Sequence, residues 1–96
     1  MDLVVVYDIA TDRPEDQRRL RAVAKVCEGF GVRVQDSVFE CRLGDVDVER
    51  MKIELADVID PDRDSIYFYQ LHATLAEARY IMGARRPHEA GTPWMF

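Results

Sequence analysis

The spacing of apolar residues changes between the period of a strand and the period of a helix along the first 71 residues, which restricts the chain to few folds. Runs of β-branched and aromatic residues indicate strands, and apolar residues at i, i+3, i+4 and i+7 indicate amphipathic helices. In chain order the pattern predicts a strand over 3–9, a helix from Pro14 to Gly29, two short strands within 32–43, a helix over 48–59 and a strand over 65–71. The only turn residues between the two short strands are Asp36 and Ser37.

This βαββαβ order predicts an α+β fold, the ferredoxin-like sandwich, with its core in residues 1–71. The chain has 96 residues, of which 48% are apolar. That composition supports a single globular domain with one modest core, which self-association would extend.

Residues 72–96 depart from this pattern. They predict a helical turn over 73–78, an extra C-terminal strand at Tyr80–Met82 and an extended tail from Gly83 onward. The tail ends in the apolar residues Trp94, Met95 and Phe96, which we expect to dock on a second subunit or on a partner.

The sequence lacks the signals of several function classes. Its longest run of aliphatic residues, Leu3–Val6, has four residues, whereas a membrane-spanning helix needs about 20. The N-terminus lacks the basic and long apolar regions of a secretory signal, so we expect a cytoplasmic protein with no membrane partner. The common glycine-rich phosphate loop, the dinucleotide fingerprint, the HExxH zinc motif and the GxSxG nucleophile motif are all absent.

The cysteines and histidines form no recognisable motif. Cys27 and Cys41 lie 14 residues apart without a CxxC pair, so we expect both to be reduced core residues. His72 and His88 lie 16 residues apart outside the predicted core elements, and we expect both at the surface.

The net charge of −5 argues against a nucleic-acid partner, but the charge is unevenly distributed. Residues 13–35 hold six basic and three acidic side chains, a local net charge of +3, whereas residues 36–64 hold four basic and ten acidic side chains, a local net charge of −6. Eleven of the 13 basic residues are arginine, whose forked hydrogen bonds suit phosphate. The basic segment is therefore either a nucleic-acid contact surface or the solvated face of a helix.

Asp8 is the first candidate for chemistry. It ends the first predicted strand just before a loop into a helix, where ligands collect in many α/β layouts. A structural role is the alternative, in which the carboxylate accepts hydrogen bonds from the following turn. One carboxylate cannot form a metal site, although two copies related by a two-fold axis can share a hydrated Mg²⁺.

Four segments of the sequence together carry a resemblance to a known protein family. They are Val4–Ile9, Arg18–Lys25, Gly31–Cys41 and Asp64–Ile66. Together they resemble the small CRISPR-associated protein two family, a partner of the CRISPR integrase. The R-V-Q-x-S-V-F-E stretch behind Y-D-I is the most specific part of the similarity, which spans residues 3–71. Tyr80–Gly83 lies where this family places a fifth strand that crosses to the other subunit.

The resemblance implies a ferredoxin-like homodimer with two roles. In the first, the dimer lies between integrase dimers and its arginines hold the backbone of the duplex DNA that becomes a new spacer. In the second, which belongs to some members, the protein is a metal-dependent endonuclease that cleaves phosphodiester bonds in RNA, including single-stranded RNA, or in DNA. Mg²⁺ or Mn²⁺ would be the cofactor, held by the two Asp8 side chains at the dimer axis.

The family motifs also imply roles for further residues. The basic first-helix motif matches Arg18, Arg19 and Arg21, which would bind nucleic acid together with Arg33. Residues near the active cleft would be Tyr7, Ser37 and Phe39. Asp36 departs from the family, which often has an aromatic residue there, and adds a negative charge near the expected phosphate path.

Two alternatives remain open at this point. The same dimer can act as a non-catalytic scaffold of the integrase complex. From a different class, the chain can be a ferredoxin-like dimer that senses a small molecule. The sensor hypothesis leaves Asp8 and the basic segment without a role.

Overall fold

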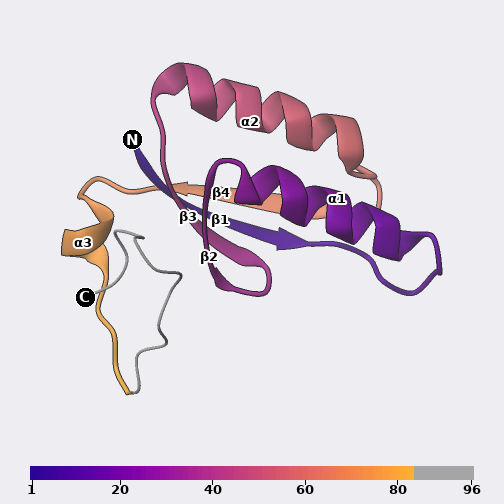
Figure 1. Ribbon diagram of the computed structural model, residues 1–96, viewed down its shortest axis with the longest axis horizontal. Coiled ribbons are helices and arrows are strands. Elements are labelled where there is room, and N and C mark those ends of the chain that lie inside the picture. Colours follow the sequence, from indigo (N-terminus) through magenta and orange to yellow (C-terminus); the bar gives the residue numbers. More distant parts are fainter. Residues whose placement is uncertain (84–96) are drawn as a thin grey trace.

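The computed structural model describes residues 1–83, which form a four-stranded antiparallel sheet with two long helices on one face (Figure 1). The elements in chain order are β1 (Asp2–Asp8), α1 (Asp16–Glu28), β2 (Gly31–Gln35), β3 (Val38–Arg42), α2 (Asp45–Val58), β4 (Ser65–Gln70) and α3 (Leu75–Ala78). The strand order is β2-β3-β1-β4, and each neighbouring pair is antiparallel. This is the ferredoxin-like arrangement, so the predicted fold is confirmed.

The core lies between the sheet and the two long helices. Alternate residues of β1, namely Leu3, Val5 and Tyr7, are buried on the helix side. The other core positions are Phe39 and Cys41 of β3, Val23, Ala24 and Cys27 of α1, and Val48, Met51 and Leu55 of α2. The helical residues recur at i, i+3, i+4 or i+7, which explains why these two segments fold as helices against the sheet.

Both cysteines are buried and unpaired, as predicted. Burial raises the pKa of Cys27 to about 12 and that of Cys41 to about 11, because a thiolate is poorly stabilised in an apolar core. Gly31 allows β2 to pack closely beside Cys41. A Cβ atom at position 31 would lie 2.4 Å from the Cys41 Sγ atom and 2.5 Å from the Glu40 carbonyl oxygen.

The start of α1 differs slightly from the prediction. The helix begins at Asp16 rather than at Pro14. The Asp16 carboxylate accepts a hydrogen bond from the Arg13 backbone N–H at 2.9 Å, which holds residues 13–16 in a turn ahead of the helix. The predicted bend at Asp36 and Ser37 is confirmed as the turn between β2 and β3.

The segment after β4 follows the prediction only in part. The predicted helical turn is present as α3, and the Thr74 hydroxyl accepts a hydrogen bond from the Glu77 N–H at its start. The predicted strand at Tyr80–Met82 is wrong for the single chain: the described residues contain no fifth strand. A strand needs a neighbour for its backbone hydrogen bonds, and Tyr80 and Met82 are more than 80% exposed.

His88 and the predicted tail residues Trp94, Met95 and Phe96 lie outside the described residues. His72 is exposed, as predicted. In the described part of the chain, no helix has the length and apolar character needed to cross a membrane.

Candidate functional site

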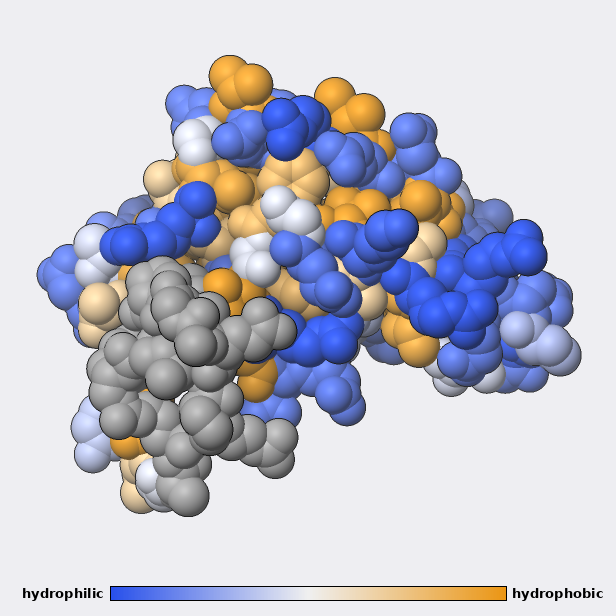
Figure 2. Space-filling view, in the orientation of Figure 1, coloured by the Kyte–Doolittle hydropathy of each residue, from blue (hydrophilic) through white to orange (hydrophobic). Residues whose placement is uncertain are grey.

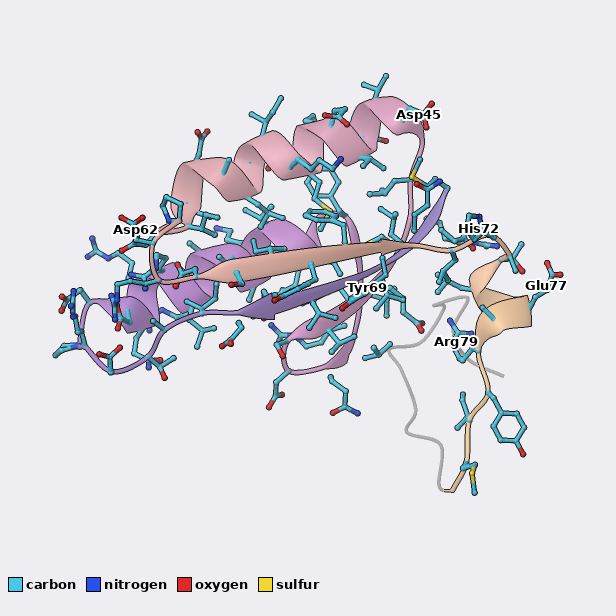
Figure 3. All side chains as sticks on the ribbon, turned by 180° about the vertical axis from the view of Figure 1, so that it is seen from behind. Asp45, Asp62, Tyr69, His72, Glu77 and Arg79 are labelled. Carbon is cyan, nitrogen blue, oxygen red and sulfur yellow. The ribbon has the colours of Figure 1, made fainter. Side chains whose placement is uncertain are left out.

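The sheet face opposite α1 and α2, here called the open face, carries a mixture of apolar and charged residues. The strand register places on it Val4, Val6 and Asp8 of β1, Ser65, Tyr67 and Tyr69 of β4, and Val38 and Glu40 of β3. Tyr67 and Tyr69 are each 54% exposed and their rings stack with centroids 6.3 Å apart. Figure 3 shows Tyr69 on the side of the sheet away from the two long helices.

The segment after β4 returns to one end of the open face. The Leu75 N–H donates to the Asp2 carboxylate at 2.7 Å, and the Arg79 guanidinium pairs with the Glu40 carboxylate. Leu75 is buried by this contact. Asp2 begins β1 and Asp8 ends it, so the segment after β4 contacts the end of the open face that contains Asp2.

Asp8 lies at the opposite end of the open face and is exposed. Its register partner on β4 is Ser65. Among residues 1–83 the Asp8 carboxylate makes no hydrogen bond or ion pair. The turn-capping role considered for Asp8 is instead performed by Asp64, which accepts a hydrogen bond from the Ala10 N–H at 3.0 Å. Asp8 is thus available to bind a ligand.

Tyr7 and Phe39 lie on the other face of the sheet. Both are buried, and their rings stack with centroids 6.2 Å apart. The Tyr7 hydroxyl donates to the Asp36 carbonyl at 2.8 Å, and the Tyr7 N–H donates to the Ser37 carbonyl at 3.0 Å. Burial raises the pKa of Tyr7, and nearby Arg33 offsets part of this effect. Tyr7 therefore holds the β2–β3 turn, which contains Ser37, against β1, and the side chains of Tyr7 and Phe39 lie on the opposite face of the sheet from the Asp8 carboxylate.

Arg33 lies on β2 at the edge of the sheet, on the helix side. Its guanidinium carbon is 5.2 Å from the centre of the Phe39 ring, and it forms an ion pair with Glu28 at 3.7 Å. Its side chain is 43% exposed. Part of the guanidinium remains accessible, but on the opposite face from Asp8.

The exposed side of α1 carries a basic stripe formed by Arg18, Arg21 and Lys25. These residues are spaced at i, i+3 and i+7, so they lie along one side of the helix. Within residues 1–83 none of the three forms an ion pair. The stripe is therefore free to contact an anionic backbone.

Arg19 lies next to this stripe in sequence but points inward. Its Nη2 atom donates to Asp64 at 3.1 Å, its Nε atom also donates to Asp64, and its Nη1 atom lies 3.0 Å from Asp16. Its side chain is only 15% exposed. The structure thus gives Arg19 internal partners, and we leave it out of the nucleic-acid surface predicted for this helix.

The ion pairs of Arg19 belong to a network that also contains Arg63 and Asp12. The two buried carboxylates of this ion-pair network are Asp16 and Asp64. Arg63 forms a bidentate contact with Asp16, at 2.7 and 2.8 Å, and also pairs with Asp12. The hydrogen bonds from Arg63 lower the pKa of Asp16 well below its usual range. Burial alone would raise the pKa of Asp64, but hydrogen bonds from Arg19 and from the backbone N–H groups of Asp60 and Ala10 lower it overall.

A sequence profile described as CRISPR associated protein Cas2 matches residues 1–77. This chain belongs to the Cas2 family. A CRISPR-associated endoribonuclease Cas2 of Chlorobaculum tepidum is 37% identical over 89 residues, which are 93% of each protein. A CRISPR-associated endonuclease Cas2 of Halalkalibacterium halodurans is 34% identical over 96 residues, the full length of both.

Solved structures share the fold, and one of them is titled Cas2. The crystal structure of Streptococcus pyogenes Cas2 at pH 6.5 superposes with a TM-score of 0.77 at 40% sequence identity, covering 86% of this chain and 100% of that one. A Thermus thermophilus protein, TT1823, superposes with a TM-score of 0.73 at 26% identity, covering 92% of this chain and 96% of that one.

The ion-pair network of this Cas2-family chain is not predicted by its sequence patterns. The sequence patterns do not single out Asp16, and Asp64 enters them only as part of a segment that matches the family. Asp16 and Arg19 are spaced at i, i+3, which is a local sign of pairing, but Asp64 lies 45 residues from Arg19. A contact of that separation depends on the tertiary fold and leaves no local pattern.

The Asp8 end of the open face presents one carboxylate that could be a ligand of a magnesium ion. Within residues 1–83 no three His, Cys, Asp or Glu side chains gather in a way that could hold a metal ion. Asp8 supplies a single exposed carboxylate, a hard oxygen ligand of the kind that Mg²⁺ prefers. A complete site therefore needs a second copy of the chain or oxygen atoms of the substrate.

Proposed function

We propose that this Cas2-family chain is a cytoplasmic CRISPR adaptation protein. Two copies pair through their open faces, bind duplex DNA together with the CRISPR integrase, and cleave phosphodiester bonds of RNA or DNA with Mg²⁺ or Mn²⁺ at the paired Asp8 side chains. One observation carries the proposal. The Asp8 carboxylate is exposed and unpartnered in residues 1–83, at the free end of the open face.

The character of the open face supports pairing with a second copy. Tyr67 and Tyr69 expose about half of their surface, and Val4 and Val6 lie between β3 and β4 without a covering helix. Exposed aromatic residues are enriched in interfaces, and a self-complementary face favours a two-fold dimer. Such pairing would extend a core that is small in the single chain.

In this proposal the described side chains have separate roles in metal binding and in nucleic-acid binding. A bound Mg²⁺ would stabilise charge on the phosphate and lower the pKa of an attacking water. Asp8 would supply the carboxylate oxygen to the ion. The basic stripe of Arg18, Arg21 and Lys25 would hold the nucleic-acid backbone without reading its sequence. The names of the two relatives, an endoribonuclease and an endonuclease, support cleavage as the reaction.

Cleavage of labelled RNA and duplex DNA in the presence of Mg²⁺ tests the proposal. Replacing Asp8→Ala is expected to reduce the cleavage rate at least about 100-fold, because the charge stabilisation by the metal is lost. Asp57→Ala is the matched control, since Asp57 is an exposed carboxylate on α2 and lies outside the open face. Equal cleavage by wild type and Asp8→Ala would show that the nuclease activity does not reside at Asp8.

A non-catalytic scaffold is the second candidate, favoured by the single carboxylate that each chain supplies. In this candidate the dimer still binds the integrase and duplex DNA, but it does not cleave phosphodiester bonds. Co-purification with the integrase, combined with absence of cleavage in Mg²⁺ and in Mn²⁺, would support the scaffold. Failure of both the integrase complex and duplex binding would contradict both candidates.

A further inference from the structure

Two loops at the Asp8 end of the molecule are joined by buried charges. The loop between β1 and α1 and the loop between α2 and β4 lie side by side at the right in Figure 1. Figure 2 shows that this end of the surface is mainly hydrophilic. The ion pairs that link the two loops involve Asp12, Asp16, Arg19, Arg63 and Asp64.

Asp64 is the centre of this network. Its side chain is fully buried and each of its oxygen atoms accepts two hydrogen bonds. One oxygen accepts from the Ala10 N–H at 3.0 Å and from Arg19, and the other accepts from the Asp60 N–H at 2.9 Å and from Arg19. The carboxylate is therefore completely satisfied, and neither oxygen is left for a ligand.

Asp64 contacts or adjoins the backbone close to Asp8 on both β1 and β4. Asp64 directly precedes Ser65, and Ser65 is the register partner of Asp8. Ala10, whose N–H Asp64 binds, is the second residue after Asp8. Asp64 thus fixes the backbone on both sides of the Asp8–Ser65 pair, at the point where the ladder between β1 and β4 ends.

We propose that Asp64, held by Arg19, is a positioning residue that fixes the Asp8 carboxylate in the geometry required for binding a divalent cation. The proposal rests on the proposed function, because it takes Asp8 as the metal ligand. A site with one carboxylate per chain depends strongly on where that carboxylate lies, since no second ligand from the same chain can compensate. It also gives Arg19 a different role from Arg18 beside it: support of the site rather than contact with phosphate.

The test uses Mn²⁺ alone as the probe, with free Mn²⁺ measured by electron paramagnetic resonance in wild type, Asp8→Ala and Asp64→Asn. Asn has the shape of Asp, but its amide group cannot accept the hydrogen bonds of a second carboxylate oxygen. Asp64→Asn is expected to weaken Mn²⁺ binding about 10- to 100-fold, the usual effect of losing a residue that supports a metal ligand. The Mn²⁺ concentration for half-maximal cleavage should rise by the same factor, while the affinity for nucleic acid stays unchanged.

Two control variants separate positioning from general loss of stability. Met51→Ala removes a fully buried side chain from α2, and Asp12→Asn removes an exposed carboxylate that contacts only Arg63 of the network. Both should bind Mn²⁺ like wild type at temperatures where they are folded. If Asp64→Asn does not fold, Arg19→Lys takes its place, because lysine keeps the charge but cannot bridge Asp64 and Asp16 with a planar fork.

The outcomes distinguish this proposal from the proposed function. Loss of Mn²⁺ binding in Asp8→Ala with unchanged binding in folded Asp64→Asn or Arg19→Lys would overturn the positioning role alone. Unchanged Mn²⁺ binding in Asp8→Ala would overturn both. If Arg19→Lys lowers nucleic-acid affinity and leaves Mn²⁺ binding intact, Arg19 contacts phosphate and the positioning role is wrong.

Discussion

Tyr7 and Asp8 are neighbours on β1, yet they lie on opposite faces of the sheet with different surroundings. Tyr7 is 4% exposed on the helix side and stacks on Phe39, whereas Asp8 is exposed on the open face beside Ser65. The two-residue period of a strand separates them. The helix-covered face holds the buried core, and the open face is the one that we propose binds a second copy and a metal ion.

The same separation occurs on α1 between Arg18 and Arg19. Arg18 belongs to the exposed basic stripe, whereas Arg19 is directed into the network of Asp16 and Asp64. Each turn of about 3.6 residues places adjacent side chains about 100° apart, so two identical neighbours have different partners. A run of arginines in a sequence is therefore not a single functional unit.

The largest effect is expected for Phe39→Ala compared with Tyr69→Ala. Phe39 is fully buried, so its truncation should lower the free energy of unfolding by about 3–5 kcal/mol. Tyr69 is half exposed on the open face, and its truncation should cost the single chain less than about 1 kcal/mol. Urea unfolding at concentrations that keep the chain monomeric measures both. Similar losses for the two variants would contradict the division between the faces.

A charge on the open face should prevent dimer formation. Tyr67→Glu places a carboxylate in the proposed interface of both copies, which should weaken dimerisation by about 2–4 kcal/mol, or roughly 30- to 1,000-fold. Ile53→Glu is the matched control, because Ile53 is 62% exposed on α2 in the helix layer. Sedimentation velocity across a dilution series gives the dissociation constants. If Ile53→Glu weakens the dimer and Tyr67→Glu does not, the interface lies on the helices and not on the open face.

The buried network predicts a pH dependence of stability. Because the pKa of Asp64 is lowered on folding, its contribution is fully present above its unfolded-state pKa of about 3.9 and is lost as the pH falls further. Asp64→Asn should therefore lower the free energy of unfolding by about 1–3 kcal/mol at pH 7. The difference from wild type should narrow below about pH 4. A difference that is constant from pH 7 to pH 3 would show that the Asp64 charge is not involved.

The smallest effect concerns the basic stripe. Replacing Arg18, Arg21 and Lys25 by Gln should reduce the slope of log affinity against log salt by about 2.7, since each phosphate contact contributes about 0.9. The control replaces Arg42, Arg50 and Lys52, which already pair with acidic residues of the chain. Filter binding to duplex DNA measures both slopes. Equal reductions would mean that duplex binding follows net charge rather than this surface.

The sequence predicted the fold well because the fold follows from local patterns. The first strand, the helical stripe of Val23, Ala24 and Cys27, and the turn at Asp36 and Ser37 all appear where they were expected. The strand predicted at Tyr80–Met82 failed because a strand depends on a neighbour that the single chain does not supply.

The site was predicted less completely. Asp8 was identified from its position at the end of a strand, and the structure places it on the surface as a ligand requires. Tyr7 and Phe39 were grouped with it by closeness in sequence or by family motif, but the pleat of the sheet directs them away from it. Arg19 and Asp64 are joined across 45 residues, and no local spacing reveals such a pair.

The stoichiometry of Mn²⁺ binding tests the central claim, that the open faces of two copies join their Asp8 side chains into one metal site. Titration of the purified protein with Mn²⁺, followed by electron paramagnetic resonance, should show one ion bound per two chains. Asp8→Ala should abolish this binding, and Tyr67→Glu should abolish it together with the dimer. One ion bound per chain, or binding that persists in the monomeric Tyr67→Glu variant, would contradict a site shared between two copies.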